Sequence, residues 1–169
     1  MDATFRRGSR VEESAELIAF DKLSEPSLRE IAQHWETARN GRDMPGRADI
    51  HPSHFPRLLP RIFMIRVTME PLAFTYSLVG GENVDAHGRN FTGMEVRELD
   101  DLWPGYGTSM HNFYALVQRE RRPKAARGVM KFVDRGFCAF ESVYLPLATP
   151  EGAVSHIMGA AVYTMEKTS

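Results

Sequence analysis

The segment from Phe74 to Leu99, FTYSLVGGENVDAHGRNFTGMEVREL, decides the fold. Apolar and mostly polar residues alternate over 74–79, which is the period of a β-strand. Two glycines at 80–81 break the strand, and residues 82–86 are long enough for one or two helical turns. Gly88 can end these turns in a left-handed conformation. A strand that leads through glycines into short helical turns forms one wall of a pocket and a cover over it.

The flanking segments complete a predicted α+β fold. Residues 62–68 read as a strand that pairs with 74–79 in a hairpin, and apolar residues at helical spacing predict a longer helix over about 106–121. Three further strands are predicted at 127–133, 139–147 and 154–165, with a turn at Arg135–Gly136. The last strand is apolar on both faces, as a central strand would be. We expect a five-stranded antiparallel sheet with short helices and the longer helix on one face.

An N-terminal amphipathic helix is predicted over residues 28–40. Ser27 and Glu30 have the spacing of a capping box at its start. Its apolar residues recur at helical spacing and form one stripe, namely Leu28, Ile31, Ala32, Trp35 and Ala38. The stripe either packs on the outer face of the sheet or forms a dimer contact, and the sequence leaves both interpretations open.

Composition excludes several classes of protein. The 169 residues include 21 basic and 22 acidic side chains, which argues against nucleic-acid binding through bulk charge. A single cysteine, Cys138, allows neither an intramolecular disulfide nor a multi-cysteine zinc site. No apolar run approaches the roughly 18 residues of a membrane span, and no signal peptide is evident. We expect a soluble, cytoplasmic protein with no nucleic-acid or membrane partner.

The proline-rich segment that follows the helix contains two histidines three residues apart, His51 and His54. Such a spacing can place two imidazoles on one side of a turn, but the nearest carboxylate is Asp49 and no cysteine is close. We interpret the segment as a surface loop and predict no metal site.

The order of these elements resembles the PAS fold over residues 60–166. A narrower likeness to a family of small bacterial stand-alone PAS proteins lies in the order and spacing of short motifs. These are Pro45-x-Arg47-x-Asp49-Ile50-x-Pro52, Leu59-Pro60, YSLVGG at 76–81, HGRNFTG at 87–93, and LPL at 145–147 followed by IMGA at 157–160. Gly81 stands where that family usually has a threonine, and Asn90 where it usually has an aspartate. We divide the chain into a mobile N-terminal segment (1–24), the N-terminal helix with its proline-rich connector (25–59) and a PAS-like domain (60–166).

The resemblance implies a signalling module with a pocket between sheet and helices, and often a homodimer. Flavin photosensors carry a reactive cysteine where this chain has Phe91, so adduct chemistry is not expected. Haem-binding PAS domains use a histidine of the long helix, and His111 keeps that alternative open. His111 lies off the centre of the apolar stripe, however, which favours a partly exposed structural residue. His87 is interpreted as a turn residue. The cofactor stays unspecified.

A small apolar or aromatic molecule is the remaining occupant for a pocket. The candidate ligand-binding residues are Met64, Phe74, Tyr76, Tyr114, Met130, Phe132, Tyr144 and His156. Aromatic and methionine side chains at these spacings also suit a filled core, and most of these residues fit that simpler interpretation. We expect Tyr76, Tyr144 and His156 to point polar groups into the pocket.

Motifs for catalysis are not found: the sequence has no G-x-S-x-G, H-E-x-x-H, P-loop or G-x-G-x-x-G. The first hypothesis is therefore a stand-alone, non-catalytic PAS-type module that binds a small ligand, a protein partner or both, and forms a homodimer. The alternative is a small enzyme or carrier of apolar ligands, with Glu141 and His156 approaching across adjacent strands. A purely structural dimer with a filled core is the third.

Overall fold

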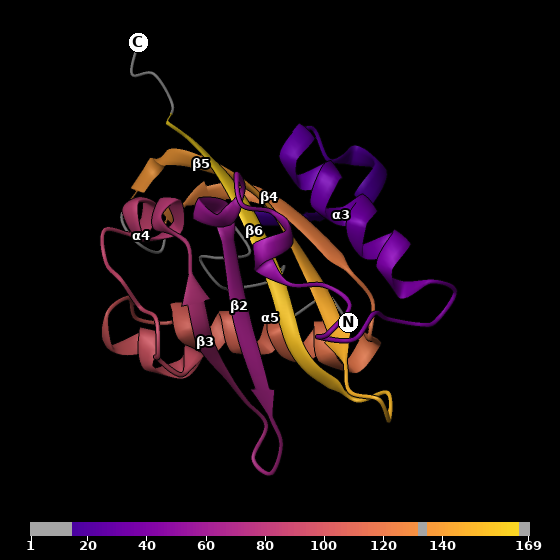
Figure 1. Ribbon diagram of the computed structural model, residues 1–169. Coiled ribbons are helices and arrows are strands. Elements are labelled where there is room, and N and C mark those ends of the chain that lie inside the picture. The colour runs from indigo at the N-terminus through magenta and orange to yellow at the C-terminus, as the bar shows by residue number, and fades with distance from the viewer. Residues whose placement is uncertain (1–14, 132–134, 166–169) are drawn as a thin grey trace.

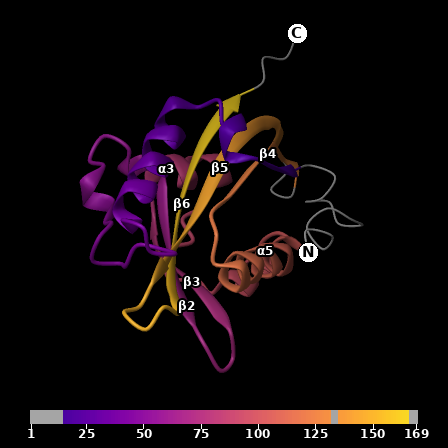
Figure 2. The ribbon, with the colours of Figure 1, turned by 90° about the vertical axis from the view of Figure 1, so that its right-hand side faces the viewer.

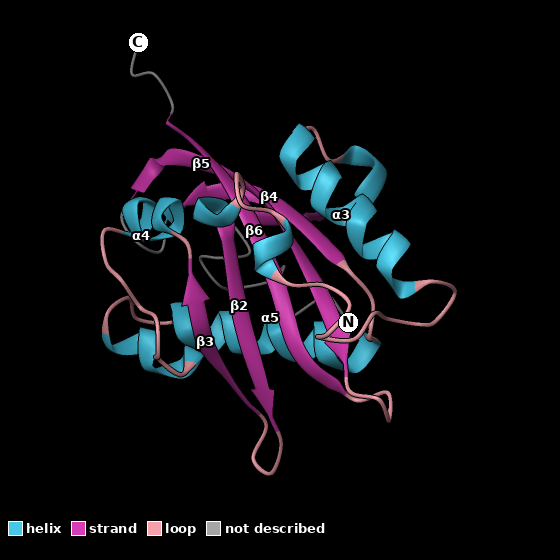
Figure 3. Cartoon of the chain, in the orientation of Figure 1, coloured by secondary structure: helices cyan, strands magenta, loops and turns pink. Residues whose placement is uncertain are grey.

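The computed structural model of the protein describes residues 15–131 and 135–165 (Figure 1). Its elements follow one another in the order β1 (Ala15–Ile18), η1 (Phe20–Lys22), α3 (Pro26–Arg39), η2 (Pro52–His54), η3 (Leu59–Arg61), β2 (Ile62–Thr68), β3 (Ala73–Val79), α4 (Gly81–His87), η4 (Val96–Asp101), α5 (Tyr106–Glu120), β4 (Lys124–Met130), β5 (Arg135–Ala148) and β6 (Val154–Met165), where η denotes a 3-10 helix. Figure 3 shows how these helices surround a single sheet.

The sheet is antiparallel and its strands lie in the order β1-β4-β5-β6-β2-β3. The α+β fold predicted from the sequence is confirmed, and β6 takes the interior position that its apolar faces predicted. Within the described residues the sheet has six strands in place of the five predicted, because Ala15–Ile18 pairs with β4. The turn predicted at Arg135–Gly136 is also wrong, since β5 begins at Arg135.

The helices cover both faces of the sheet. α5 lies on one face and α3 lies on the other, as the side view shows (Figure 2), and α4 lines the same space as α5. α5 contacts β3, β5 and β6, whereas α3 contacts β5 and β6 from the opposite side. α5, the longer helix predicted from the sequence, therefore shares a face with the short helix α4, as expected. It forms one wall of the cavity described below.

The apolar stripe of α3 packs on the domain itself, which was one of the two interpretations of this helix. Leu28, Ile31 and Trp35 are buried, and the Trp35 indole N–H donates a hydrogen bond of 2.9 Å to the carbonyl oxygen of Pro146 on β5. The buried stripe fixes α3 against the outer face of the sheet.

The predicted capping box at Ser27 is wrong. Ser27 is inside the helix and buried, and the N-cap residue Glu25 makes no side-chain cap. The carboxylate of Glu141 on β5 instead accepts hydrogen bonds from the backbone N–H groups of Ser24 and Glu25, both at 2.9 Å. A carboxylate here satisfies backbone donors and complements the helix dipole.

A small residue on β6 allows a close approach by a side chain of β2. Gly159 lies opposite Phe63 of β2, and a Cβ atom at this position would collide with the Phe63 ring. The outer atoms of the Phe63 ring therefore occupy the space beside the glycine, on the sheet face that borders the cavity described below.

Candidate functional site

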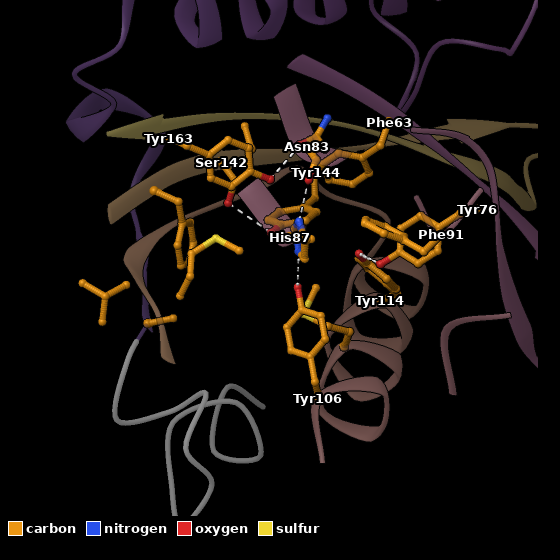
Figure 4. A pocket seen from close by; sticks show the side chains of 16 residues that line it. Phe63, Tyr76, Asn83, His87, Phe91, Tyr106, Tyr114, Ser142, Tyr144 and Tyr163 are labelled. Carbon is orange, nitrogen blue, oxygen red and sulfur yellow. Dashed lines mark hydrogen bonds between the residues drawn. The ribbon is translucent and has the colours of Figure 1, made fainter. Parts of the chain in front are cut away.

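A cavity of about 80 Å³ lies between the sheet and the helices α4 and α5 (Figure 4). The residues that line it are Ala15, Phe63, Tyr76, Asn83, His87, Phe91, Tyr106, Met110, Tyr114, Val129, Met130, Phe140, Ser142, Tyr144, Ala161 and Tyr163. They come from all six strands, both helices and the segment after α4. Most are aromatic or aliphatic, which is the usual composition of a small-molecule pocket.

Local periodicity explains how the chain points these side chains inward. On α5, Tyr106, Met110 and Tyr114 are four residues apart and lie on one side of the helix. On β5, Ser142 and Tyr144 are two residues apart and share one face of the strand. Helical and strand spacing together therefore build the two opposing walls.

Two pairs of hydroxyl groups meet on the wall formed by the sheet and α5. The hydroxyls of Tyr76 and Tyr114 lie 2.7 Å apart, and either can be the donor. The Ser142 hydroxyl donates to the Tyr144 hydroxyl at 3.0 Å. The Tyr114 and Tyr144 ring centroids are 6.0 Å apart, so the two pairs are neighbours.

A second polar group connects α4 to α5 and β6. His87 Nδ1 lies 2.8 Å from the carbonyl oxygen of Asn83, so Nδ1 carries the proton and donates. In the neutral imidazole Nε2 is then the acceptor, and it accepts a hydrogen bond of 3.2 Å from the Tyr106 hydroxyl. The Tyr163 hydroxyl donates to Asn83 Oδ1 at 2.7 Å. Each of these protons is committed to a protein acceptor.

The cavity is electrically neutral. Among its described lining residues there is no Asp, Glu, Lys or Arg. Burial raises the pKa of the Tyr144 hydroxyl to about 12 and raises the pKa of Tyr76 even further, despite the lowering effect of hydrogen bonds from Ser142 and Tyr114 respectively. The tyrosines therefore stay protonated at neutral pH and offer hydroxyl groups to a bound molecule.

Four of the eight candidate ligand-binding residues line this cavity, namely Tyr76, Tyr114, Met130 and Tyr144. Phe74 is buried two residues before Tyr76, with its ring centroid 5.7 Å from that of Tyr114, but it does not line the cavity. Phe132 lies outside the described residues. Ligand binding by the four lining residues stays a prediction.

Met64 and His156 lie on the opposite face of the sheet. Met64 follows Phe63, which lines the cavity, and adjacent strand residues point to opposite faces. His156 is five positions before Ala161 on β6, an odd number, so it too points away from the cavity. The expectation that His156 points its imidazole into the pocket is therefore wrong.

Several lining residues were missed from the sequence. His87, interpreted there as a turn residue, is the last residue of α4 and is buried. Asn83 and His87 are four residues apart, as are Tyr106 and Met110, and this helical spacing was a signal that could have placed them together. Phe91 follows α4 in a segment without periodicity and gave no such signal.

His111 does not line the cavity, and it is not partly exposed as expected. It is buried on α5, where its Nε2 lies 2.8 Å from an Arg97 nitrogen and its ring packs 5.2 Å from that of Phe74. Burial lowers the pKa of His111, and the Arg97 charge lowers it further. The haem alternative depended on this histidine, so it loses its proposed ligand.

Glu141 and His156 do not form the catalytic pair considered for an enzyme. Glu141 lies opposite Val162 in the β5–β6 ladder, whereas His156 lies opposite Leu147, so the two are far apart along the strands. The Glu141 carboxylate is instead occupied by its hydrogen bonds to the start of α3.

Other candidate sites are simpler. His54 Nδ1 accepts the backbone N–H of His51 at 3.2 Å, and His51 Nδ1 contacts Ser53, so both histidines stabilise the η2 turn. Within residues 15–131 and 135–165, no group of three or more His, Cys, Asp or Glu side chains could hold a metal ion. None of the helices described in this structure is long and apolar enough to cross a membrane.

Comparisons with known proteins agree with the motifs in the sequence. The profile of the PAS domain family matches residues 23–162, a range that includes α3, the strands β2 to β5 and most of β6. A solved structure of an RNA-binding light-oxygen-voltage receptor is similar, with a TM-score of 0.45 and 13% sequence identity over 66% of this chain. The match covers 32% of that receptor chain, so this chain spans about a third of its length. No curated protein matches.

Proposed function

This chain belongs to the PAS domain family, and on that premise we propose that it is a non-catalytic sensory module that binds a small, mainly apolar molecule. PAS domains are generally sensory or signalling modules, and they are usually non-catalytic. The proposed binding site is the cavity between the sheet and the helices α4 and α5, and the proposed output is an altered contact with a protein partner.

The observation that carries the proposal is a neutral, aromatic cavity into which polar groups point. A filled core would leave no such space, because protein interiors pack to the density of organic crystals. Apolar walls with a few placed polar groups are typical of a site for a small molecule. Met110 and Met130 on the walls are flexible side chains that can adapt to a guest.

In this proposal, β5 transmits the effect of ligand binding to the surface that contacts a partner. Ser142 and Tyr144 line the cavity, while Glu141 between Phe140 and Ser142 points to the other face and holds the start of α3. A ligand that favours one position of β5 therefore also favours one position of α3. Because the apolar stripe of α3 is buried, its polar outer face is the surface that we assign to a protein partner or to the second subunit of a homodimer.

Native mass spectrometry of the purified protein tests this proposal, because it reports bound molecules and oligomeric state together. We expect extra mass that is lost on denaturation, which would come from a bound molecule. We also expect a native mass twice that of the chain, which would come from a homodimer. A protein that stays free of any bound mass, and whose spectrum does not respond to a library of small neutral compounds, would refute ligand sensing. Turnover of a candidate substrate would favour the alternative of a small enzyme.

A further inference from the structure

The two hydroxyl pairs on the cavity wall hold more protons than they use. A hydroxyl group carries one proton and can accept up to two. In the Tyr76–Tyr114 pair one proton forms the hydrogen bond between the two hydroxyls, and the other has no acceptor among the described residues. In the Ser142–Tyr144 pair the serine proton is used, and the Tyr144 proton is left over. Each pair therefore has one spare donor.

The remaining hydroxyl groups behave differently, which makes the spare protons a local property. The Tyr163 hydroxyl donates a hydrogen bond to Asn83 Oδ1, and the Tyr106 hydroxyl donates one to His87 Nε2. These hydrogen bonds connect β6 and α5 to α4, and they leave neither hydroxyl with a spare proton to donate.

The side chains that carry the spare donors are buried, and their rings lie next to each other. Ser142, Tyr114, Tyr76 and Tyr144 are between 1% and 7% exposed. The Tyr76 and Tyr114 ring centroids are 6.2 Å apart, and those of Tyr114 and Tyr144 are 6.0 Å apart. Each of these hydroxyl oxygens already has one hydrogen-bond partner, so what remains is the capacity to donate two more hydrogen bonds, and no described residue accepts them.

We propose, as a refinement that rests on the ligand-binding function above, that the cavity selects neutral molecules with a hydrogen-bond acceptor, a carbonyl oxygen in the first instance. A carbonyl oxygen has two lone pairs and can take one proton from each pair of hydroxyls. A charged ligand is disfavoured, because no lining residue among those described carries an opposite charge to offset its desolvation.

The size of the cavity limits the ligand further. Its volume of about 80 Å³ is roughly half of the 150 Å³ of an engineered apolar cavity that binds benzene. A ring of five or six atoms therefore fits once Met110 and Met130 adjust, and much larger ligands require movement of the helices.

The test compares two probes of one shape. Cyclopentanone and methylenecyclopentane differ in an oxygen atom replaced by a CH₂ group, so only the ketone can accept a hydrogen bond. Protein labelled with ¹³C at the methionine methyl groups is titrated with each, and the Met110 and Met130 signals report binding at the cavity. We expect the ketone to bind about tenfold more tightly, as a hydrogen bond of ordinary strength requires.

Paired variants assign the preference to the hydroxyls. The double variants Tyr76→Phe/Tyr114→Phe and Ser142→Ala/Tyr144→Phe each remove one complete pair, and each should lower the preference for the ketone severalfold. The single variant Tyr76→Phe leaves the Tyr114 proton free to donate, so this variant should retain most of the preference for the ketone. Ser77→Ala is the control, because the Ser77 hydroxyl donates to the carbonyl oxygen of Met64 and does not line the cavity, so its loss should not change the ratio.

The outcomes separate the two proposals. Equal affinity of the wild-type protein for the two probes would overturn the acceptor preference and leave the small-molecule cavity standing. A preference that survives in both double variants would overturn the role of the hydroxyl pairs. If neither probe shifts the Met110 or Met130 signals, ligand binding in this cavity itself fails. The wild-type comparison holds even where a double variant does not fold.

Discussion

Replacing Glu141 with glutamine tests how the sheet holds α3. One carboxylate oxygen accepts the backbone N–H groups of Ser24 and Glu25 at 2.9 Å each, and the other accepts the Ser24 hydroxyl at 2.7 Å and an Arg127 N–H at 3.3 Å. The side chain is only 8% exposed. Burial raises the pKa of Glu141, but the hydrogen bonds from Glu25 and Ser24, with the Arg127 charge, outweigh this and leave the pKa lowered.

The magnitude follows from what glutamine retains. It keeps one oxygen and can keep both backbone hydrogen bonds, but its NH₂ group cannot accept from Arg127 and carries no charge. Hydrogen bonds to charged groups contribute about 1.5–3 kcal/mol, so we expect the free energy of unfolding to fall by about 2 kcal/mol. For a chain of this length, that change lowers the melting temperature by about 4–8 °C.

Thermal unfolding followed by circular dichroism at pH 7 measures the effect. Glu120→Gln is the matched control, because Glu120 pairs with Lys124 at 2.7 Å with a side chain that is 38% exposed. Surface pairs contribute little, so the control should lose no more than about 2 °C. Melting temperatures for the two variants that agree within error would refute the anchoring role of Glu141.

The sign of the pH dependence gives a second check on the same variant. A carboxylate whose folded pKa is lowered stabilises the protein above its unfolded pKa, about 4.3 for glutamate, and loses this contribution as the pH falls through the folded pKa. The difference in stability between wild type and Glu141→Gln should therefore be full at pH 7 and shrink below about pH 4. A difference that is equal at pH 3 and pH 7 would contradict the argument.

Three further changes test other parts of the structure. Gly159→Ala forces a methyl group against the Phe63 ring and should cost about 1–3 kcal/mol of unfolding free energy in urea titrations, whereas no loss would mean that the ring has room to move. Trp35→Phe removes the hydrogen bond to the Pro146 carbonyl and should cost about 1–3 kcal/mol, and an unchanged urea midpoint would show that this bond does not fix α3. Burial is the main cause that lowers the pKa of His111, so the stability of the wild-type protein should fall as the pH drops below about 6.5. His111→Gln should reduce that loss of stability between pH 7.5 and 5.5. An equal loss in wild type and variant would refute this role of His111.

Periodicity predicted most of the fold, because it is a local property of the chain. The helices at 26–39 and 106–120 and the five longer strands lie where their apolar patterns indicated. Ala15–Ile18 was missed, because four residues are too few to show an alternating pattern. That strand exists through its pairing with β4, which is more than a hundred residues later in the chain.

The candidate site was harder to predict, because alternation shows which residues share a face but not what covers that face. Phe63 and Met64 are both apolar neighbours on β2, and nothing within the strand shows that Phe63 faces the helices. Phe91 comes from the irregular segment after α4, where spacing carries little information, whereas the helical spacing of Asn83 and His87 was a signal that was missed. The four predicted residues that line the cavity, which include Tyr76 and Tyr144, lie on strands and a helix whose apolar faces were clear.

The cap of α3 shows the same limit. The sequence offered a local capping box at Ser27, and local motifs are all that neighbouring residues can reveal. In the folded protein, Glu141 supplies the cap from a strand 116 residues away from Glu25. A contact of this kind arises from topology, which brings β5 under the start of the helix.

β5 gives the fold a short path from the cavity to the far side of the sheet. Its residues Ser142 and Tyr144 face the cavity, and Glu141, one peptide away, holds the first turn of α3. Further along the strand, the carbonyl of Pro146 accepts the hydrogen bond from Trp35 in the middle of the same helix. Since α3 is tied to β5 at two points, a shift of this strand moves the helix as a unit. On the proposal that a ligand bonds to Ser142 and Tyr144, we expect its effect to cross the sheet within this single strand, without rearrangement at the sheet edges.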